Sequence, residues 1–324
     1  MNEYRMNDDK GTAGTAAAAW IEASGVAAQD WPAGALYVAA TPIGNAADIT
    51  LRVLHALSIA DAVFAEDTRV TRKLLDRYGL RPPALLAAHA HNEREAAQAI
   101  AARLADGQRV VLVSDAGTPA VSDPGARVVA AVRAAGHRVI PLPGASSALA
   151  ALCASGLVPG GFTFAGFLPL GARERERALQ AVAVSVLASV LFEAPHRIEA
   201  TARALAAALP AGRRVVVARE LTKKFESIDT LTAAQLPTFI AAEPQRGEYV
   251  LLVEAADAAA LTSIDEVTQR WLAALAPALP AARAAAVAAR ATGLPRDALY
   301  AALAAMRSSI DAPVTTTTGN DDSS

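Results

Sequence analysis

The sequence predicts an α/β protein, with two α/β domains followed by a small helical appendage. Three observations predict this class. Short apolar runs alternate with segments of helical spacing from residue 36 onward, two apolar runs in the second half follow each other without a helix between them, and alanine dominates after residue 263. Alternating strands and helices are typical of a mainly parallel sheet with helices on both faces, whereas strands without a crossover helix indicate a mixed sheet.

The first α/β domain is expected over residues 35–143. Its predicted strands are 36–41, 61–67, 109–115 and 137–143, and its predicted helices are 50–59, 68–79, 93–106 and 125–136. The strands are apolar runs that end in proline, glycine or acidic residues, and the helices have apolar residues spaced three and four apart. Gly136 stops the last helix and Pro143 stops the last strand.

The second α/β domain is expected over residues 144–260. Its predicted strands are 162–167, 188–194, 213–220 and 247–255, with 225–231 as a further strand that follows its predecessor directly. The alanine-rich helical appendage is expected over residues 261–307, with interruptions at Pro277, Pro280 and Gly293.

Disordered tails are expected at both ends of the chain, over residues 1–34 and 308–324. Neither segment has a regular apolar period, and the second is a polar run. Trp20 and Trp31 are the residues of the first tail that could dock onto the body of the protein.

Composition argues against several classes of protein. No apolar run reaches the roughly 18 residues that span a bilayer, and the charged start, with Asp8 and Asp9, is unlike a secretory signal. The single cysteine, Cys153, leaves no disulfide framework and no cysteine-based metal site. We therefore expect a cytoplasmic protein. Because the net charge is −2, any RNA substrate must meet a local basic surface.

Unusual residues follow four predicted strands of the first domain. The segments are TPIGN (41–45), EDTR (66–69), SDAGTP (114–119) and PGASSA (143–148). Each one alone is also an ordinary turn, but ligands of α/β sheets collect outside the carboxyl ends of the strands. Gly44, Gly117 and Gly144 permit a close approach of the backbone to a ligand. Four such loops together indicate a binding site.

The same loops indicate the kind of ligand. Asp115 can accept hydrogen bonds from ribose hydroxyls or an ammonium group, and Ser146 and Ser147 lie where a helix would begin. The sequence has neither GxGxxG after its first strand nor GxxxxGK[ST] anywhere, so a dinucleotide or nucleoside triphosphate site is poorly supported. The loops therefore favour a small polar ligand with little phosphate, such as S-adenosylmethionine.

Eight motifs carry a resemblance to a known family. In order over residues 36–254 they are LYVAATPIGN, AEDTR, HAHNE, VSDAGTPAVSDPG, PLPGASSAL, FEAPHR, ARELTKKFE and RGEYVLLVE. Together they resemble the tetrapyrrole methylase superfamily and, within it, the group that methylates a cytidine 2′-hydroxyl of 16S ribosomal RNA. The segment TGLPRDALY (292–300) is similar to the C-terminal region of that group.

The resemblance implies that S-adenosylmethionine binds in a cleft between the two α/β domains and that the protein is a homodimer. The cofactor contacts that it implies are Pro42, Asp115, Ala116, Gly117, Ala120, Ser146, Ser147, Phe192, Glu193 and Leu221. Three positions depart from the family pattern: Ala145 stands where proline is common, Phe192 where tyrosine is frequent and Arg246 where lysine is typical. Arg246 keeps the charge but puts a lysine-specific role in doubt.

Methyl transfer to a ribose hydroxyl benefits from a nearby proton acceptor. The candidates are Glu66, Asp67, His89, His91, Glu93 and Glu220. We favour Glu66 and Asp67 as catalytic residues, with Arg69 beside them, because they end a strand that faces the expected cleft. Asp67 has two structural alternatives, a cap on the following helix or an ion pair with Arg69. Asp123 is expected to cap the helix that follows it.

The residues expected to bind the RNA substrate are His91, Asn92, Arg197, Lys223 and Lys224. Lys223 and Lys224 directly follow a predicted strand and are the better candidates for phosphate contacts. No metal site is expected, since the HxH spacing of His89 and His91 lacks the usual partners. Two other functions stay open: methylation of a small tetrapyrrole, and a non-catalytic role in ribosome assembly.

Overall fold

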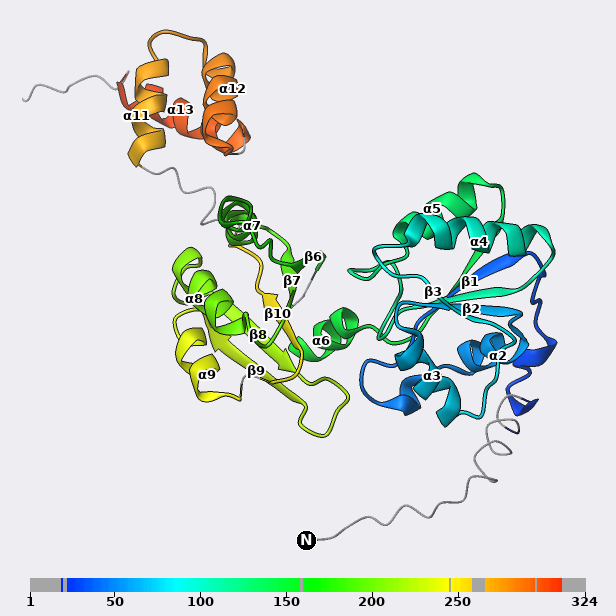
Figure 1. Cartoon of the computed structure of the whole chain (residues 1–324). Helices are drawn as coiled ribbons and strands as arrows, with labels where there is room; N and C mark the ends of the chain where they lie inside the picture. Colours follow the sequence, from blue (N-terminus) through cyan, green and yellow to red (C-terminus); the bar gives the residue numbers. More distant parts are fainter. Residues whose placement is uncertain are drawn as a thin grey trace, which may run out of the picture. The chain divides into compact units, whose positions relative to one another are not determined.

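The computed structural model describes residues 19, 22–157, 160–244, 246–257, 266–294 and 296–310, which divide into two compact units (Figure 1). The first unit contains two β-sheets with their helices. The second contains three C-terminal helices.

The first sheet is entirely parallel. Its strands are β1 (Ala35–Ala39), β2 (Ala62–Ala65), β3 (Leu85–Ala87), β4 (Val110–Val113) and β5 (Arg138–Leu142), in the order β3-β2-β4-β1-β5. In the central register, Leu36 lies opposite Val110 on one side and Val139 on the other. The prediction of a mainly parallel sheet is confirmed. Strand β3 was not predicted, because three residues are too short to form a recognisable apolar run.

Helices cover both faces of this sheet, as the sequence predicted. They are α2 (Leu51–Ile59), α3 (Thr68–Arg77), α4 (Glu93–Ala105) and α5 (Ala126–Ala134), and a short 3-10 helix, η2 (Ala46–Asp48), precedes α2. Side chains of a strand alternate between faces, so Tyr37 and Val111 pack in the cluster that includes α2 and α3. Leu36 and Leu112 point the other way and pack with α4 and α5.

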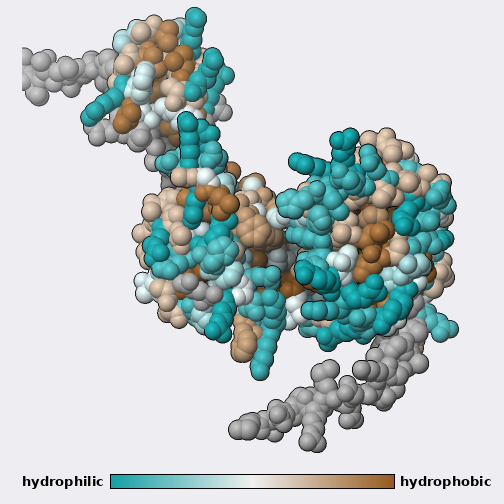
Figure 2. All heavy atoms as spheres, in the orientation of Figure 1, coloured by the Kyte–Doolittle hydropathy of each residue, from teal (hydrophilic) through white to brown (hydrophobic). Residues whose placement is uncertain are grey.

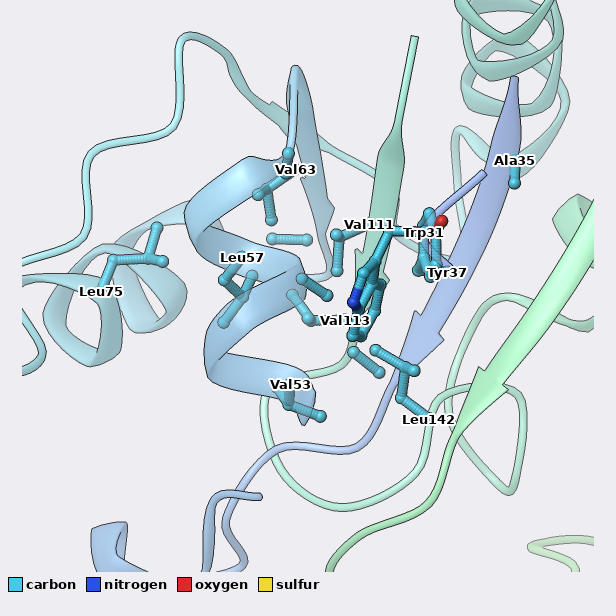
Figure 3. Packing of buried hydrophobic residues seen from close by; sticks show 14 of the residues in the cluster. Trp31, Ala35, Tyr37, Val53, Leu57, Val63, Leu75, Val111, Val113 and Leu142 are labelled. Atoms are coloured by element: carbon cyan, nitrogen blue, oxygen red, sulfur yellow. The ribbon is translucent and has the colours of Figure 1, made fainter. Parts of the chain in front are cut away.

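Trp31 lies in the core beside Tyr37, as Figure 3 shows. Its indole Nε1–H donates a hydrogen bond of 2.8 Å to the carbonyl of Val26 in the 3-10 helix η1 (Val26–Ala28), and its ring lies 5.6 Å from that of Tyr37. A buried tryptophan removes a large apolar area from water while its N–H finds a partner. The chain therefore packs into the core before residue 35, within the segment where a disordered tail was expected. Trp20, residues 1–18 and residues 311–324 lie outside the described residues, whereas residues 308–310 of the expected second tail belong to a helix.

The second sheet is mixed. Its strands are β6 (Phe162–Phe167), β7 (Ala188–Glu193), β8 (Arg214–Arg219), β9 (Ser227–Thr232) and β10 (Tyr249–Val253), in the order β6-β7-β10-β8-β9. Strand β6 is parallel to β7, whereas the other pairs are antiparallel. The direct connection from β8 to β9 agrees with the sequence prediction. The accompanying helices are α6 (Ser147–Ser155), α7 (Ala172–Val184), α8 (Ile198–Ala208) and α9 (Leu236–Ala242).

The second unit consists of α11 (Glu266–Leu275), α12 (Ala281–Thr292) and α13 (Arg296–Ile310), which confirms the predicted helical appendage. Its small core contains Leu272, Leu299 and Leu303 packed against alanines of α12. Alanine favours helix and lets neighbouring helices approach closely. Among the residues that the structure describes, no helix is long and apolar enough to cross a membrane.

We predict that Gly144→Ala destabilises the protein, because the turn from β5 to α6 has no room for a side chain. A Cβ at this position would lie 2.9 Å from the Cβ of Ala40, an atom that cannot move without its backbone. Overpacking of this kind costs about 1–3 kcal/mol. Urea unfolding of Gly144→Ala should show a lower midpoint with an unchanged slope.

Gly212→Ala is the matched control, since a Cβ there would meet no heavy atom within 4 Å. It should leave the midpoint unchanged or raise it slightly, because alanine restricts the unfolded chain. Equal midpoints for the two variants would contradict the prediction.

Candidate functional site

Three loops that follow β1, β4 and β5 are joined by hydrogen bonds at the carboxyl edge of the first sheet. Thr41 and Gly117 exchange backbone hydrogen bonds of 2.8 and 2.9 Å, and the Thr118 hydroxyl donates to the carbonyl of Ala145 at 3.2 Å. Each loop therefore fixes the position of its neighbour at this edge of the sheet.

The loops after β2 and β4 are joined by a reciprocal pair of hydrogen bonds. The Asp67 N–H donates to the carboxylate of Asp115 at 2.9 Å, and the Asp115 N–H donates to the carboxylate of Glu66 at 3.3 Å. A backbone donor thus holds one oxygen of each carboxylate. This arrangement lets two acidic side chains from adjacent strands lie close together.

A cavity of about 440 Å³ lies next to these loops, and residues from both sheets line it. In the space-filling view, hydrophobic side chains are visible in the recess between the two α/β lobes (Figure 2). The volume is in the range of small-molecule sites. The predicted site residues found in its lining are Glu66, Asp115, Ala116, Gly117, Ser146, Ser147, Phe192, Glu193 and Leu221.

Two of the predicted cofactor contacts, Pro42 and Ala120, are not in the cavity lining. The neighbour of Pro42, Ile43, lines the cavity in its place. Ala120 has a φ of 67° and its N–H donates to the carbonyl of Pro124, which turns the loop so that Val121 reaches the cavity instead. The loops that the motifs indicated do line this cavity, but local backbone conformation decides which side chain faces inward.

Asp67 and Arg69 are also absent from the cavity lining. Asp67 caps α3 by accepting a hydrogen bond of 2.8 Å from the Arg69 N–H, and its carboxylate forms an ion pair of 2.6 Å with the Arg69 guanidinium. Hydrogen bonds from the Arg69 side chain lower the pKa of Asp67 to about 2. The two structural alternatives considered for Asp67 are therefore both realised.

Glu66 and Asp115 have the opposite electrostatic character. Burial raises the pKa of Glu66, and the charges of Asp115 and Asp67 add to the rise. Burial likewise raises the pKa of Asp115, while the hydrogen bond from the Asp67 N–H opposes the rise. The charge of Arg69 also lowers the pKa of Asp115, but burial outweighs it, so both carboxyl groups have a raised pKa.

Asp123 does not cap α5, so that prediction was wrong. The N-cap position belongs to Gly125, whose N–H is taken by the carboxylate of Glu93 at 2.8 Å. Asp123 instead lines the cavity. Burial raises its pKa to about 6, and the charges of Glu66, Asp115 and Glu248 add to the rise.

Glu193 lines the cavity, but its carboxylate is bonded to residues in and just before α8. It accepts hydrogen bonds from the Ala194 N–H at 2.9 Å and the Thr201 hydroxyl at 2.6 Å, and it pairs with Arg197 at 3.2 Å. The Arg197 side chain also donates to the carbonyl of Leu168. Arg197, predicted to bind substrate, is thus used to neutralise a buried acid.

Lys223 is held between two carboxylates, Glu220 and Glu248, each 2.8 Å from its Nζ. Its stem lies against Gly44, where an added Cβ would be 2.5 Å from the Lys223 Cγ. The Asn45 N–H also donates to the Thr222 hydroxyl at 3.0 Å. Lys223 therefore joins the loop after β8 to the loop after β1, instead of presenting an uncompensated charge.

Lys224 is exposed and belongs to the same loop between β8 and β9. This loop extends beyond the sheet (Figure 1). The Lys224 Nζ lies 5.6 Å from the ring centroid of Phe225, and Phe225 is 68% exposed. Phe225 was not predicted as a site residue, although it directly follows the two lysines in ARELTKKFE.

His91 and Asn92 lie away from the cavity. The side-chain amide of Asn92 closes the turn after β3: its oxygen accepts from the His89 N–H at 2.7 Å and its nitrogen donates to the Ala87 carbonyl at 3.0 Å. His91 lines a separate groove of about 590 Å³ between α4 and α5. Within the described part of the chain, no group of three or more metal-binding side chains occurs.

Further residues of the cavity lining were not predicted as site residues. They are Ile43, Thr118, Val121, Asp123, Phe167, Ala194, Pro195, Glu248, Tyr249 and Val250. Phe167 and Phe192 form an edge-to-face pair with ring centroids 5.7 Å apart. Most of these residues lie inside the eight motifs quoted above. Membership of a motif was therefore the feature of the sequence that could have predicted them.

The lining is suited to a ligand with an apolar part, hydroxyl donors and positive charge. Phe167 and Phe192 supply aromatic surface, and Glu66, Asp115 and Asp123 supply acceptors and negative charge. Carboxylates repel phosphate, so a phosphate-rich ligand does not fit. An adenosine joined to an amino acid through a sulfonium has the matching groups.

Comparison with protein families gives two matches. Residues 35–237 match the family described as Tetrapyrrole (Corrin/Porphyrin) Methylases. Residues 262–307 match the family described as RsmI C-terminal HTH domain, and α11, α12 and α13 lie in that range.

Curated relatives are similar to most of the chain. The protein named Ribosomal RNA small subunit methyltransferase I of Mesorhizobium japonicum is 47% identical over 82% of this chain and 90% of its own length. Proteins of the same name from Xylella fastidiosa and Neisseria meningitidis serogroup B are 46% and 44% identical, each over 82% of this chain and over 98% and 92% of their own lengths.

Solved structures share the fold of the first unit. Uroporphyrin-III-C-methyltransferase from Thermus thermophilus has a TM-score of 0.51 at 20% identity, covering 68% of this chain and 94% of its own. Cobalt precorrin-4 methyltransferase, CbiF, has a TM-score of 0.52 at 22% identity, covering 68% and 95%. At these identities the likeness concerns the fold alone. The family match over residues 35–237, together with the curated relatives, shows that the chain belongs to the tetrapyrrole (corrin/porphyrin) methylase family.

Proposed function

We propose that this protein transfers a methyl group from S-adenosylmethionine to the ribose 2′-hydroxyl of a cytidine in small-subunit ribosomal RNA. The observation that carries the proposal is the match over 82% of the chain to relatives named Ribosomal RNA small subunit methyltransferase I. The cavity supports it, since loops of both sheets supply an acidic, partly aromatic lining.

S-Adenosylmethionine supplies an electrophilic methyl group on a positively charged sulfur. One oxygen of the Asp115 carboxylate accepts from the Asp67 N–H. The other oxygen can accept a hydrogen bond from a hydroxyl or ammonium group of this ligand. Phe167 and Phe192 offer apolar surface for the adenine, and the backbone near Gly117 permits close approach.

Positioning accounts for much of such a transfer, because the acceptor oxygen must lie in line with the carbon–sulfur bond. We propose that Asp67 and Arg69 act by holding the loop after β2, and that Glu66 contributes negative charge inside the cavity. Glu193 and Arg197 similarly fix the loop after β7.

The loop between β8 and β9 is the proposed RNA contact. Lys224 supplies a positive charge for a phosphate and the exposed ring of Phe225 supplies a face for a base. Lys223 holds the base of this loop through its two ion pairs. A local basic and aromatic contact of this kind is compatible with the net charge of −2.

We place the reaction in the cytoplasm, where ribosomal RNA is found. We also propose a homodimer, supported by exposed apolar side chains on and beside the edge strand β6, namely Phe162, Phe167 and Leu170. Sedimentation of the full-length protein at micromolar concentration tests the dimer, and a single species of 33.3 kDa would contradict it.

The direct test of the function uses small ribosomal subunits from a strain that lacks this methyl group. Purified protein and S-adenosylmethionine labelled in the methyl group should transfer label to one cytidine ribose of the RNA. Label found only on an added tetrapyrrole, or on no acceptor, would contradict the proposal.

Asp115→Asn should weaken S-adenosylmethionine binding about tenfold without unfolding the protein. The amide oxygen of asparagine can still accept from the Asp67 N–H, whereas the negative charge that strengthens a hydrogen bond to the ligand is lost. Isothermal titration calorimetry measures the affinity. The control is Asp76→Asn, an exposed position paired with Arg81, which should bind normally. Equal affinities would remove Asp115 from the site.

Lys224→Ala should weaken binding of the small subunit and reduce the dependence of affinity on salt by about one phosphate contact. Arg133→Ala, which removes an equal charge from an exposed position on α5, is the control. Filter binding over a range of salt concentrations gives both slopes. A loss of affinity that is the same for both variants would show a general charge effect and not a contact.

A further inference from the structure

The segment 118–125 brings Asp123 into the cavity between the two sheets. Asp123 lines the cavity with Val121. Ser122 lies beside the second sheet, since a Cβ added at Gly166 of β6 would be 3.1 Å from the Ser122 Oγ. The segment belongs to the loop that follows β4 of the first sheet and carries the Asp123 carboxylate to the place where groups of both sheets meet.

This segment is held in an unfavourable backbone conformation. Ala120 and Ser122 have φ values of 67° and 65°, a region that residues with a side chain rarely adopt. The surrounding contacts impose it, because the Ala120 N–H donates to the Pro124 carbonyl and the Gly125 N–H donates to Glu93. Non-glycine residues in such conformations concentrate at functional sites.

The groups facing Asp123 are mainly acidic. Glu66 approaches from the end of β2, Asp115 from the end of β4 and Glu248 from the start of β10. A hydrogen bond with the Ser114 side chain acts in the opposite direction and lowers the pKa of Asp123. Burial and these acidic neighbours raise the pKa of Asp123 to about 6. A carboxylate with a raised pKa is a stronger proton acceptor than an ordinary one.

Asp123 has a side-chain hydrogen-bond partner, Ser114, whereas two neighbouring carboxylates of the cavity, Glu66 and Asp115, have a backbone donor. Glu66 accepts from the Asp115 N–H and Asp115 accepts from the Asp67 N–H. The backbone N–H stabilises the charged form of the carboxylate in Glu66 and in Asp115, and protonation of either carboxylate would weaken its hydrogen bond.

We propose that Asp123 is the proton acceptor for the hydroxyl group that is methylated in this cavity. This inference rests on the proposed function, which by itself does not say which group accepts the proton. In the transfer, the hydroxyl oxygen forms a bond to the methyl carbon and the electron pair of the broken carbon–sulfur bond stays on sulfur. The hydroxyl proton passes to the Asp123 carboxylate. One negative and one positive charge disappear together, which a partly desolvated cavity favours.

The test compares the full-length protein with Asp123→Asn, Glu66→Gln and the matched control Asp76→Asn, which lies on α3 outside the cavity. Single-turnover methylation of unmethylated small subunits is followed from pH 5 to 8. Calorimetry measures S-adenosylmethionine affinity, and carbon-13 NMR follows carboxyl titration in the protein without ligand.

The single-turnover rate of the unchanged protein should rise with pH through about 6, because an aspartate accepts a proton only when ionised. Asp123→Asn should lower the plateau rate by about 10²-fold or more and abolish the rise, with S-adenosylmethionine affinity within about threefold of the unchanged protein. A carboxyl resonance titrating near pH 6 should be present in the free protein and absent from this variant.

Glu66→Gln should move the rise to lower pH, since it removes a negative neighbour of Asp123. This shift tests the proposal even where Asp123→Asn does not fold. Asp76→Asn should match the unchanged protein in every measurement.

Three results would overturn the inference. If the unchanged protein methylates the subunits and Asp123→Asn retains its rate, another group accepts the proton, although the proposed function stands. If Asp123→Asn loses S-adenosylmethionine affinity in proportion to its rate, Asp123 is a cofactor contact. If the unchanged protein labels no RNA, the proposed function fails and this inference fails with it.

Discussion

The reciprocal hydrogen bonds between the loops after β2 and β4 are the interaction on which the site depends. Each loop supplies one backbone N–H and one carboxylate, so that Asp67 and Glu66 are both tied to Asp115. Carboxylates on adjacent parallel strands would otherwise repel each other at this distance. The backbone amides offset part of that repulsion. The carboxylates of Glu66 and Asp115 can therefore line one cavity while β2 and β4 stay paired.

The resulting charge pattern divides the surface between two kinds of ligand. The cavity is acidic and therefore suits a cation, whereas the positive charge available for RNA phosphates lies on the outer loop with Lys224. Lys223 lies at the border and is neutralised by Glu220 and Glu248. A chain with net charge −2 can accordingly act on an anionic polymer, because the contact needs to be basic only where the polymer touches it.

The sequence was sufficient for the fold because its signals are local. Apolar runs and helical spacing define most elements of the first sheet, and only β3, three residues long, escaped them. The site was less predictable where the role of a side chain depends on which residue outside its own loop it contacts. Arg197 was expected to meet substrate but neutralises Glu193, which lies buried at the end of β7. Patterns within one loop contain no information about such partners.

The role of Asp123 also could not be predicted from its own loop, because it depends on a residue far away in the sequence. An aspartate just before a helix is normally its cap. Here Glu93, at the start of α4, takes the Gly125 N–H that such a cap would serve at the start of α5. Glu93 was itself a candidate proton acceptor, yet its effect is structural: it satisfies the helix end from outside. The Asp123 carboxylate is therefore released from its usual local bond, and the strained backbone at Ala120 and Ser122 can direct it into the cavity.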